Sequence, residues 1–262
     1  MTDAPFSKSW LLGDLQLIWS ASSIVGKVRQ LNEDSWLDEP GLFIVADGMG
    51  GHEAGEVASR ITIDVWREHL GDLPLDIQQV EQLAIEANSR VRAYGRAEGS
   101  SGMGTTLVGL VLIDNGGHNA LSIVNVGDSR CYAFDPEIGL TLVTRDHSVV
   151  QELVEAGALT LSEAAVHPDR NLITRAIGVD DSVVPDLVVI PRSQTEMHTQ
   201  RFLLCSDGVS GELTDETMAY YLAANPDPAV AVQALLDGVM ETDAADNATA
   251  IVVDTTWVSE PA

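Results

Sequence analysis

The sequence predicts an α+β fold in which two antiparallel β-sheets form a sandwich and helices pack on the outside. Three observations lead to this prediction. Short apolar or β-branched runs bounded by turn residues recur along most of the chain, as is typical of β-rich proteins. Strong turn sequences join successive runs, which makes neighbouring strands antiparallel. Two adjacent stretches with helical periodicity lie between strand runs, where they would cover one face of a sheet.

Eight segments are predicted as strands because each combines an apolar or β-branched run with turn residues at its ends. They are residues 41–48, 105–114, 119–129, 131–134, 140–144, 187–191, 201–208 and 248–258. The turn from Asp114 to Gly117 reads Asp-Asn-Gly-Gly, and asparagine and glycine tolerate the positive φ that tight hairpins need. The segment from Asp135 to Gly139 predicts a second hairpin. Successive hairpins of this kind predict antiparallel sheets.

Two long helices are predicted next to each other. Over residues 53–70 the apolar positions on one helical face are Ala54, Val57, Ile61, Val65 and Leu70. Over residues 76–97 they are Ile77, Val80, Ala84, Ala87, Val91 and Tyr94. Spacings of three and four residues are typical of amphipathic helices. The short connection at residues 71–74 predicts an antiparallel pair, and shorter helices are predicted at 149–156, 216–223 and 229–241.

Composition excludes several classes of function. The 262 residues are 45% hydrophobic, which is ample for one sizeable core. With 14 basic against 40 acidic residues the net charge is −26, which argues against nucleic acid or an anionic membrane as partner. The first residues lack the features of a signal peptide, and no segment is long and apolar enough to cross a bilayer. Cys131 and Cys205 are expected as buried thiols, so a cytoplasmic location is predicted.

Aspartates stand at the tips of four predicted core strands. Apolar runs end at Asp47, Asp128 and Asp207, and Asp246 stands just before another. One such residue is an ordinary turn, because Asp-Gly is common where strands end. Four of them form a site if the strand tips converge, since clustered carboxylates repel one another unless a cation lies among them. Ligands that are all oxygens select hard cations, which favours Mg²⁺ or Mn²⁺ over zinc.

A polar stretch near the N-terminus contains Arg29, Glu33 and Asp34. Taken alone it is a solvated turn before a strand. Beside a metal site, however, the planar guanidinium of Arg29 is suited to hold phosphate oxygens. The glycine that follows Asp47, Gly48, allows the backbone to approach a metal closely.

Six short motifs occur in the same order as in one known family. They are R-x-x-N-E-D at 29–34, D-G-M-G-G at 47–51, G-T-T at 104–106, G-D-S-R at 127–130, S-D-G at 206–208 and D-N at 246–247. On these motifs the sequence resembles the metal-dependent serine/threonine protein phosphatases (the PPM, or type 2C, family) in their bacterial form. The likeness extends from about Ser20 to Trp257 and implies a single domain over residues 1–262. It also implies an αββα sandwich with antiparallel helix pairs outside the two sheets.

The resemblance implies a metal site for two Mn²⁺ or Mg²⁺ ions. In this family the residue matching Asp47 bridges the two ions, and the carbonyl matching Gly48 reaches the second. Asp207 and Asp246 match ligands of the first ion. Asp128, together with Asp207, matches the residues that hold a third ion in bacterial members.

Further roles follow from the same resemblance. Glu33 and Asp34 match residues that hold metal-bound waters or contact the second ion, and Arg29 matches the phosphate-binding arginine. Arg29 and Asp47 are therefore expected to act in catalysis. Residues 146–178 resemble the flap that borders the site in bacterial members. Met49 stands where eukaryotic members have a histidine proposed as general acid, so no acid is assigned, and His52 is expected to cap or pack against the following helix.

The implied reaction is hydrolysis of phosphoserine and phosphothreonine in proteins by a metal-activated water, without a phosphoenzyme. The implied partners are phosphoprotein substrates and an opposing serine/threonine kinase. Thiolate chemistry is disfavoured because neither Cys131 nor Cys205 has an arginine six residues on. A pseudophosphatase is disfavoured because all the metal-site aspartates are present. The sequence leaves open a hydrolase of small phosphorylated metabolites, whose specificity would lie in the flap and surface loops.

Overall fold

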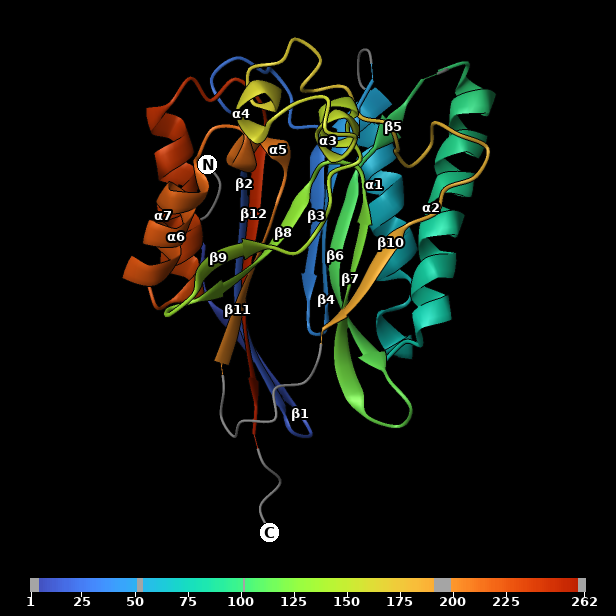
Figure 1. The fold of residues 1–262 in the computed structure, drawn as a ribbon. Helices are drawn as coiled ribbons and strands as arrows, with labels where there is room; N and C mark the ends of the chain where they lie inside the picture. Colours follow the sequence, from blue (N-terminus) through green and yellow to red (C-terminus); the bar gives the residue numbers. More distant parts are fainter. Residues whose placement is uncertain (1–4, 51–53, 101, 191–198, 259–262) are drawn as a thin grey trace.

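The computed structural model describes residues 5–50, 54–100, 102–190 and 199–258. Two antiparallel sheets pack face to face in it (Figure 1). The strands of the first sheet are β1 (Lys8–Leu12), β2 (Leu15–Ile24), β8 (Arg130–Asp135), β9 (Gly139–Leu142), β11 (Thr199–Cys205) and β12 (Ala248–Trp257). Those of the second are β3 (Asp34–Glu39), β4 (Leu42–Met49), β6 (Leu107–Asp114), β7 (Asn119–Val126) and β10 (Asp186–Ile190), and β5 (Gly104–Thr105) pairs with β4. The strand orders are β1-β2-β12-β11-β8-β9 and β10-β7-β6-β4-β3.

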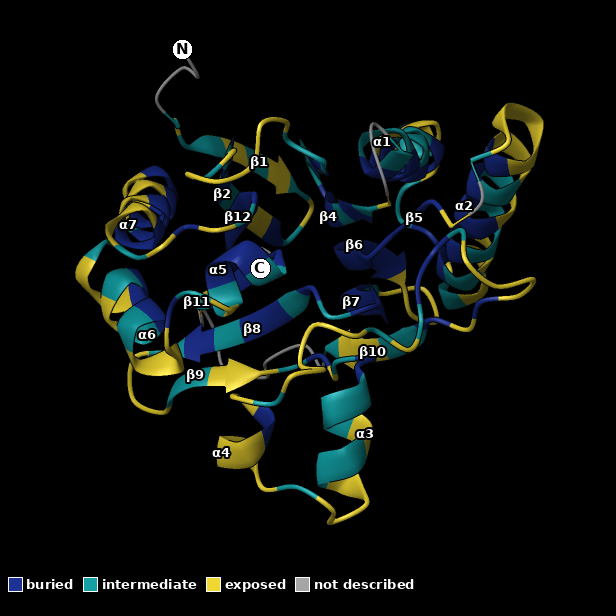
Figure 2. Ribbon diagram, turned by 90° about the horizontal axis from the view of Figure 1, so that it is seen from above, coloured by how far each residue is buried: buried dark blue, intermediate teal, exposed yellow. Residues whose placement is uncertain are grey.

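Helix pairs cover the outer faces of both sheets. The second sheet carries α1 (Ala54–Arg67) and α2 (Ile77–Glu98), which are joined through the 3₁₀ helix η1 (Leu70–Asp72). The first sheet carries α6 (Asp215–Ala224) and α7 (Pro228–Glu241), with the short α5 (Asp207–Ser210) at the end of β11. The remaining helices, α3 (Val149–Glu155) and α4 (Leu161–Ala164), project from the sandwich (Figure 2). No helix in the described ranges is both long and apolar enough to cross a membrane.

Three apolar layers hold the four layers of structure together. Leu42, Ile44 and Ala46 of β4 pack toward α1 and α2, whereas Phe43 and Val45 of the same strand pack between the sheets. Because successive side chains of a strand point to opposite faces, a strand buried on both faces is an unbroken apolar run. This arrangement explains the continuous sequence that leads into Asp47.

The predicted αββα sandwich is confirmed, and so are both hairpin turns. Asp114 pairs with Asn119 across the first turn and Asp135 with Gly139 across the second. All eight predicted strand segments overlap a strand of the structure, and the shorter predicted helices correspond to α3, α6 and α7. His52 lies outside the described residues.

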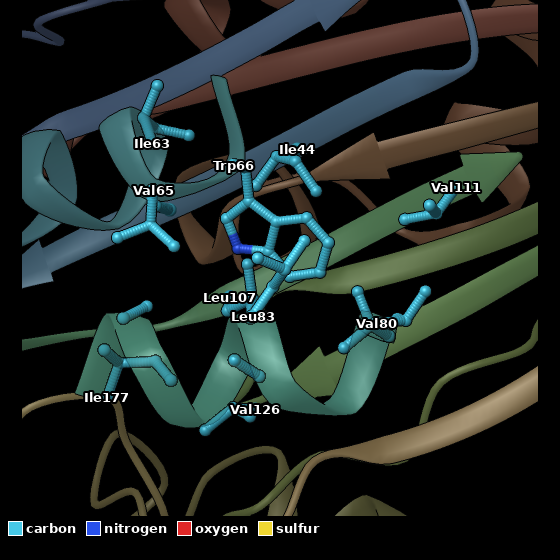
Figure 3. Packing of buried hydrophobic residues seen from close by; sticks show 14 of the residues in the cluster. Ile44, Ile63, Val65, Trp66, Val80, Leu83, Leu107, Val111, Val126 and Ile177 are labelled. Atoms are coloured by element: carbon cyan, nitrogen blue, oxygen red, sulfur yellow. The ribbon is translucent and has the colours of Figure 1, made fainter. Parts of the chain in front are cut away.

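The predicted inner face of α1 is partly wrong. Of its five positions only Val65 is fully buried, whereas Ala54, Val57, Ile61 and Leu70 pack at the margin of the cluster. The ring of Trp66 instead fills the space between α1, α2 and the sheet (Figure 3). Thr62 is buried because its hydroxyl donates to the carbonyl of Ala58 at 3.0 Å, so it needs no other partner.

The outer part of the α2 face also differs from the prediction. Tyr94 is 41% exposed, and the adjacent Gly95 is buried in its place. The other predicted positions of this helix are buried or pack against the cluster.

Three strands, β1 to β3, were not predicted. In β2 the period of two is present, since Leu15, Leu17 and Trp19 enter the layer between the sheets. The serines that follow obscure it, because serine-rich segments are typical of loops. β3 is polar and lies at a sheet edge, and its register with β4 places Asp34 opposite Asp47.

Candidate metal centre

The site carboxylates lie in or next to the tips of β3, β4, β7, β11 and β12, at the upper end of the sandwich in Figure 1. There a pocket of about 310 Å³ is lined by every predicted site residue except Asp34. These lining residues are Arg29, Glu33, Asp47, Gly48, Asp128, Asp207 and Asp246. Met49, Gly50, Thr106, Asn171 and Ile173 complete the wall. The structure therefore brings together carboxylates that lie up to 213 positions apart in the sequence, from Glu33 to Asp246.

Asp34 is buried beside the pocket rather than in its lining. One of its carboxylate oxygens, Oδ2, accepts hydrogen bonds from Ser206 Oγ at 2.8 Å and from Thr249 Oγ1 at 2.6 Å. The other, Oδ1, has no hydrogen-bond partner among the described residues. Burial raises the pKa of Asp34 to about 7 even though the two hydroxyl groups oppose this shift.

The carboxylates that line the pocket disfavour one another's charge. Burial raises the pKa of Asp128 to about 7, with a further contribution from Asp207. Burial also raises the pKa of Asp47 well above its ordinary range, and the charges of Asp34 and Asp207 add to this effect. Burial also raises the pKa of Asp207, and the charge of Asp246 adds to this effect.

These carboxylates fit a hard cation. Asp207 Oδ1 is buried without a hydrogen-bond partner among the described residues, and an unpaired buried oxygen of this kind is costly. No cysteine or histidine is among the described residues that line the pocket. An all-oxygen donor set that lacks internal compensation is suited to Mg²⁺ or Mn²⁺.

Arg29 lines the pocket, but its contacts there were not predicted from the sequence. Its Nη2 donates to Asp246 Oδ2 at 2.7 Å, and Nη1 lies 3.5 Å from Glu33 Oε2. The guanidinium thus pairs with a predicted metal ligand, and this hydrogen bond raises the pKa of Arg29. In the described part of the chain, no group of three or more His, Cys, Asp or Glu side chains is arranged to hold a metal ion.

The backbone at Asp47 and Gly48 is held tightly. A Cβ atom on Gly48 would lie 2.2 Å from the carbonyl oxygen of Gly55 and 2.5 Å from that of Glu33, so only glycine fits. Thr106 Oγ1 accepts from the Asp47 amide at 2.9 Å, and Thr105 Oγ1 donates to the Asp47 carbonyl at 2.8 Å. The Gly-Thr-Thr motif does not by itself predict that Thr105 and Thr106 hold the backbone of Asp47.

Asn247 is a second residue whose role was missed. Its Oδ1 accepts from the Glu33 amide at 2.8 Å, while Nδ2 donates to the carbonyls of Val25 and Leu31 at 3.0 and 2.9 Å. Asn247 therefore fixes the segment that carries Arg29 and Glu33 against the start of β12. The only sequence signal was its place beside Asp246.

His147 joins the flap, residues 146–178, to the loop that carries Asp128. Its Nδ1 accepts from the Gly127 amide at 3.0 Å, and its own amide donates to the Gly127 carbonyl at 2.9 Å. Nε2 lies 3.2 Å from Asp186 Oδ2. Arg175 Nη1 lies 3.0 Å from the same nitrogen. Because Nδ1 accepts from the Gly127 amide, the neutral ring carries its proton on Nε2, and burial lowers the pKa of His147. The residue holds the loop and does not line the pocket.

Comparison with known proteins identifies the family of the chain. The family model described as protein phosphatase 2C matches residues 27–244. The serine/threonine protein phosphatase PstP of Mycobacterium tuberculosis is 38% identical over 244 residues, which are 92% of this chain and 45% of that protein. The chain thus spans less than half the length of that relative. The serine/threonine phosphatase stp of Listeria monocytogenes is 33% identical, over 87% of this chain and 92% of that protein.

Solved structures show the same fold. The catalytic domain of PstP in complex with two manganese ions superposes with a TM-score of 0.81 at 35% identity, covering 94% of this chain and 100% of that one. The phosphatase MsPP of Mycobacterium smegmatis, in complex with cacodylate, gives 0.79 at 29% identity, over 92% and 98% of the two chains. With the family match extending over most of its length, this chain belongs to the protein phosphatase 2C family.

Proposed function

We propose that this chain is a metal-dependent serine/threonine protein phosphatase. The observation that carries the proposal is the pocket in which Asp47, Asp128, Asp207 and Asp246 converge. The names of the relatives support it, and so does the PstP structure that holds two manganese ions. One apolar layer shared by both sheets supports a single domain.

The ligands proposed for two ions are Asp47, the carbonyl of Gly48, Asp207 and Asp246, with Asp128 available for a third. Glu33 and Asp34 are proposed to hold metal-bound waters or to contact the second ion. Bound Mn²⁺ or Mg²⁺ supplies a nucleophilic hydroxide near neutral pH and stabilises negative charge on the phosphoryl group. Protonated carboxyl groups are poor ligands, so the raised pKa values of Asp47 and Asp128 make metal binding compete with protons.

Arg29 is the proposed phosphate-binding residue. It lies at the rim of the pocket, 46% exposed, and its guanidinium is already paired with a carboxylate. If Asp246 ligated a bound ion, the guanidinium of Arg29 would be released from it, and its planar N–H groups could hold phosphoryl oxygens instead. Arg29 thereby orients the phosphorus toward the attacking water and neutralises charge as the bond to the leaving oxygen breaks.

A phosphoenzyme is not part of the proposal. Both cysteines are fully buried in strands, and burial raises the pKa of Cys205 to about 12, so a thiolate does not form near neutral pH. The one hydroxyl side chain of the described lining, Thr106, is engaged with the Asp47 amide and with Ser129 Oγ. Water is the remaining nucleophile.

The proposed substrates are phosphoserine and phosphothreonine in proteins that an opposing kinase has modified. The test compares turnover of phosphopeptides and of small phosphate esters, with Mn²⁺ and after exhaustive dialysis against chelator. We expect phosphopeptide turnover that requires metal and is lost in Asp47→Asn, Asp207→Asn and Asp246→Asn. Asp237→Asn on the exposed side of α7 is the control that retains activity.

Two results would contradict the proposal. Full activity after removal of metal, or near wild-type rates in all three site variants, would exclude the metal centre. Turnover confined to small esters would instead make the protein a hydrolase of phosphorylated metabolites.

A further inference from the structure

A second cavity, of about 320 Å³, adjoins the metal pocket. The two share Asp128, Asn171 and Asp207 in their linings. The flap helices α3 and α4 supply apolar wall residues, among them Val154 and Leu161, and α5 forms the opposite side. Leu161 is 73% exposed, so this wall is open to a ligand. A peptide whose phosphorylated residue enters the metal pocket therefore passes this cavity.

Most charges in this second cavity are already compensated. Arg130 donates three hydrogen bonds to Asp146, at 3.0, 3.2 and 2.7 Å. Asp128 and Asp207 belong to the proposed metal centre. A lysine or arginine of a ligand would therefore find no free carboxylate here and would face Arg170.

Arg170 is the exception. It lines the cavity and is exposed, yet among the described residues it has no carboxylate oxygen within the 4.0 Å of an ion pair. Every other arginine that the structure describes has such a partner. In a chain with 40 acidic residues, an arginine left without a partner beside the active pocket points to an anion supplied from outside.

We infer that the cavity binds the part of the substrate next to the phosphorylated residue, and that Arg170 pairs there with an anionic side chain. This inference rests on the proposed function. The anion is a carboxylate or a second phosphate, since the planar guanidinium binds two oxygens of either group. The apolar wall accommodates the aliphatic part of the same segment. Arg170 is thus a specificity determinant that favours acidic or doubly phosphorylated sites despite the negative charge of the whole protein.

The test uses the full chain at saturating Mn²⁺. Singly phosphorylated peptides carry an aspartate, or an alanine as reference, at each position within three residues of the phosphoserine, and a further set carries a second phosphoserine there. The readout is the ratio of kcat/KM for the anionic peptide to that for its alanine reference. We expect wild type to prefer the anionic peptide at one or more positions, and Arg170→Ala to lower this ratio about three- to tenfold. Comparing the aspartate and phosphoserine sets identifies which anion is preferred.

Two further variants sharpen the result. Arg170→Glu should reverse the preference toward peptides with lysine at the same position. Arg67→Ala removes the same charge at the far end of α1, about 20 Å along the helix from its first residue, and should leave the ratio unchanged. Turnover of p-nitrophenyl phosphate checks that each variant has assembled its metal centre. If wild type shows no preference, or if Arg170→Ala lowers kcat/KM equally for all peptides, the inference is overturned. If wild type hydrolyses no phosphopeptide at all, the proposed function fails instead.

Discussion

Replacing Asp128 with asparagine should stabilise the metal-free protein. The ionised carboxylate is unfavourable in the fold, because burial and the neighbouring Asp207 raise its pKa to about 7 from an ordinary value of 3.8. At about 1.4 kcal/mol for each pH unit of difference, ionisation costs the folded protein up to about 4 kcal/mol. Neighbouring carboxyl groups take up protons and relieve part of this cost, so we expect Asp128→Asn to gain about 2–4 kcal/mol at about pH 8.

The stability gained by Asp128→Asn should depend on pH, because the pKa of Asp128 is raised in the folded protein. A carboxyl group whose pKa is raised in the folded state contributes its full stability below the pKa of the unfolded chain, and this contribution is lost as the pH rises through about 7. The advantage of Asp128→Asn should therefore be near zero at about pH 4, less than half complete at about pH 5 and complete at about pH 8.

Urea unfolding in the presence of chelator measures this directly. Asp237→Asn on the exposed surface of α7 is the matched control and should change stability little at any pH. Saturating Mn²⁺ should reduce or reverse the advantage, because a bound ion stabilises the wild-type fold and the variant has lost one ligand. The reasoning is refuted if metal-free Asp128→Asn is no more stable than wild type at about pH 8.

Further variants at two residues, Arg29 and His147, separate the positioning of the site from its chemistry. Arg29→Ala should lower kcat/KM for phosphopeptide about ten- to a hundredfold at saturating Mn²⁺, with partial recovery in Arg29→Lys. Arg29→Ala also removes a half-exposed ion pair with Asp246, which is worth about 0.2–1 kcal/mol. Titration with Mn²⁺ should therefore show that the variant binds the ion equally well or slightly more tightly than wild type. Weaker binding would instead show that Arg29 supports the metal site. His147→Asn keeps an acceptor for the Gly127 amide and should retain more Mn²⁺ affinity than His147→Gln, which keeps only the donor toward Asp186. If both variants lose the same Mn²⁺ affinity, and the loss follows the fall in their melting temperatures, the role of His147 is purely structural.

The sequence by itself determined the class of fold and pointed to the aspartates at the strand tips, whereas Glu33 and Asp34 received roles only from the family resemblance. The fold class and these aspartates depend on local patterns: an apolar run that ends in aspartate, an Asp-Asn-Gly-Gly turn, and the periodicity of the α2 segment. Each pattern is set by neighbours along the chain, because backbone preference and side-chain alternation act over a few residues. A strand such as β4, buried on both faces, is unmistakable for this reason.

Only the tertiary structure decided how these parts meet. β3 is polar and is a strand because β4 pairs with it, and Asp34 is buried because Ser206 and Thr249 of the other sheet donate to it. The ion pair of Arg29 with Asp246 joins residues 217 positions apart. The isolation of Arg170 depends on where every carboxylate of the described chain lies. Burial and ion pairing depend on residues that are far apart in the sequence, so a local sequence pattern cannot predict them.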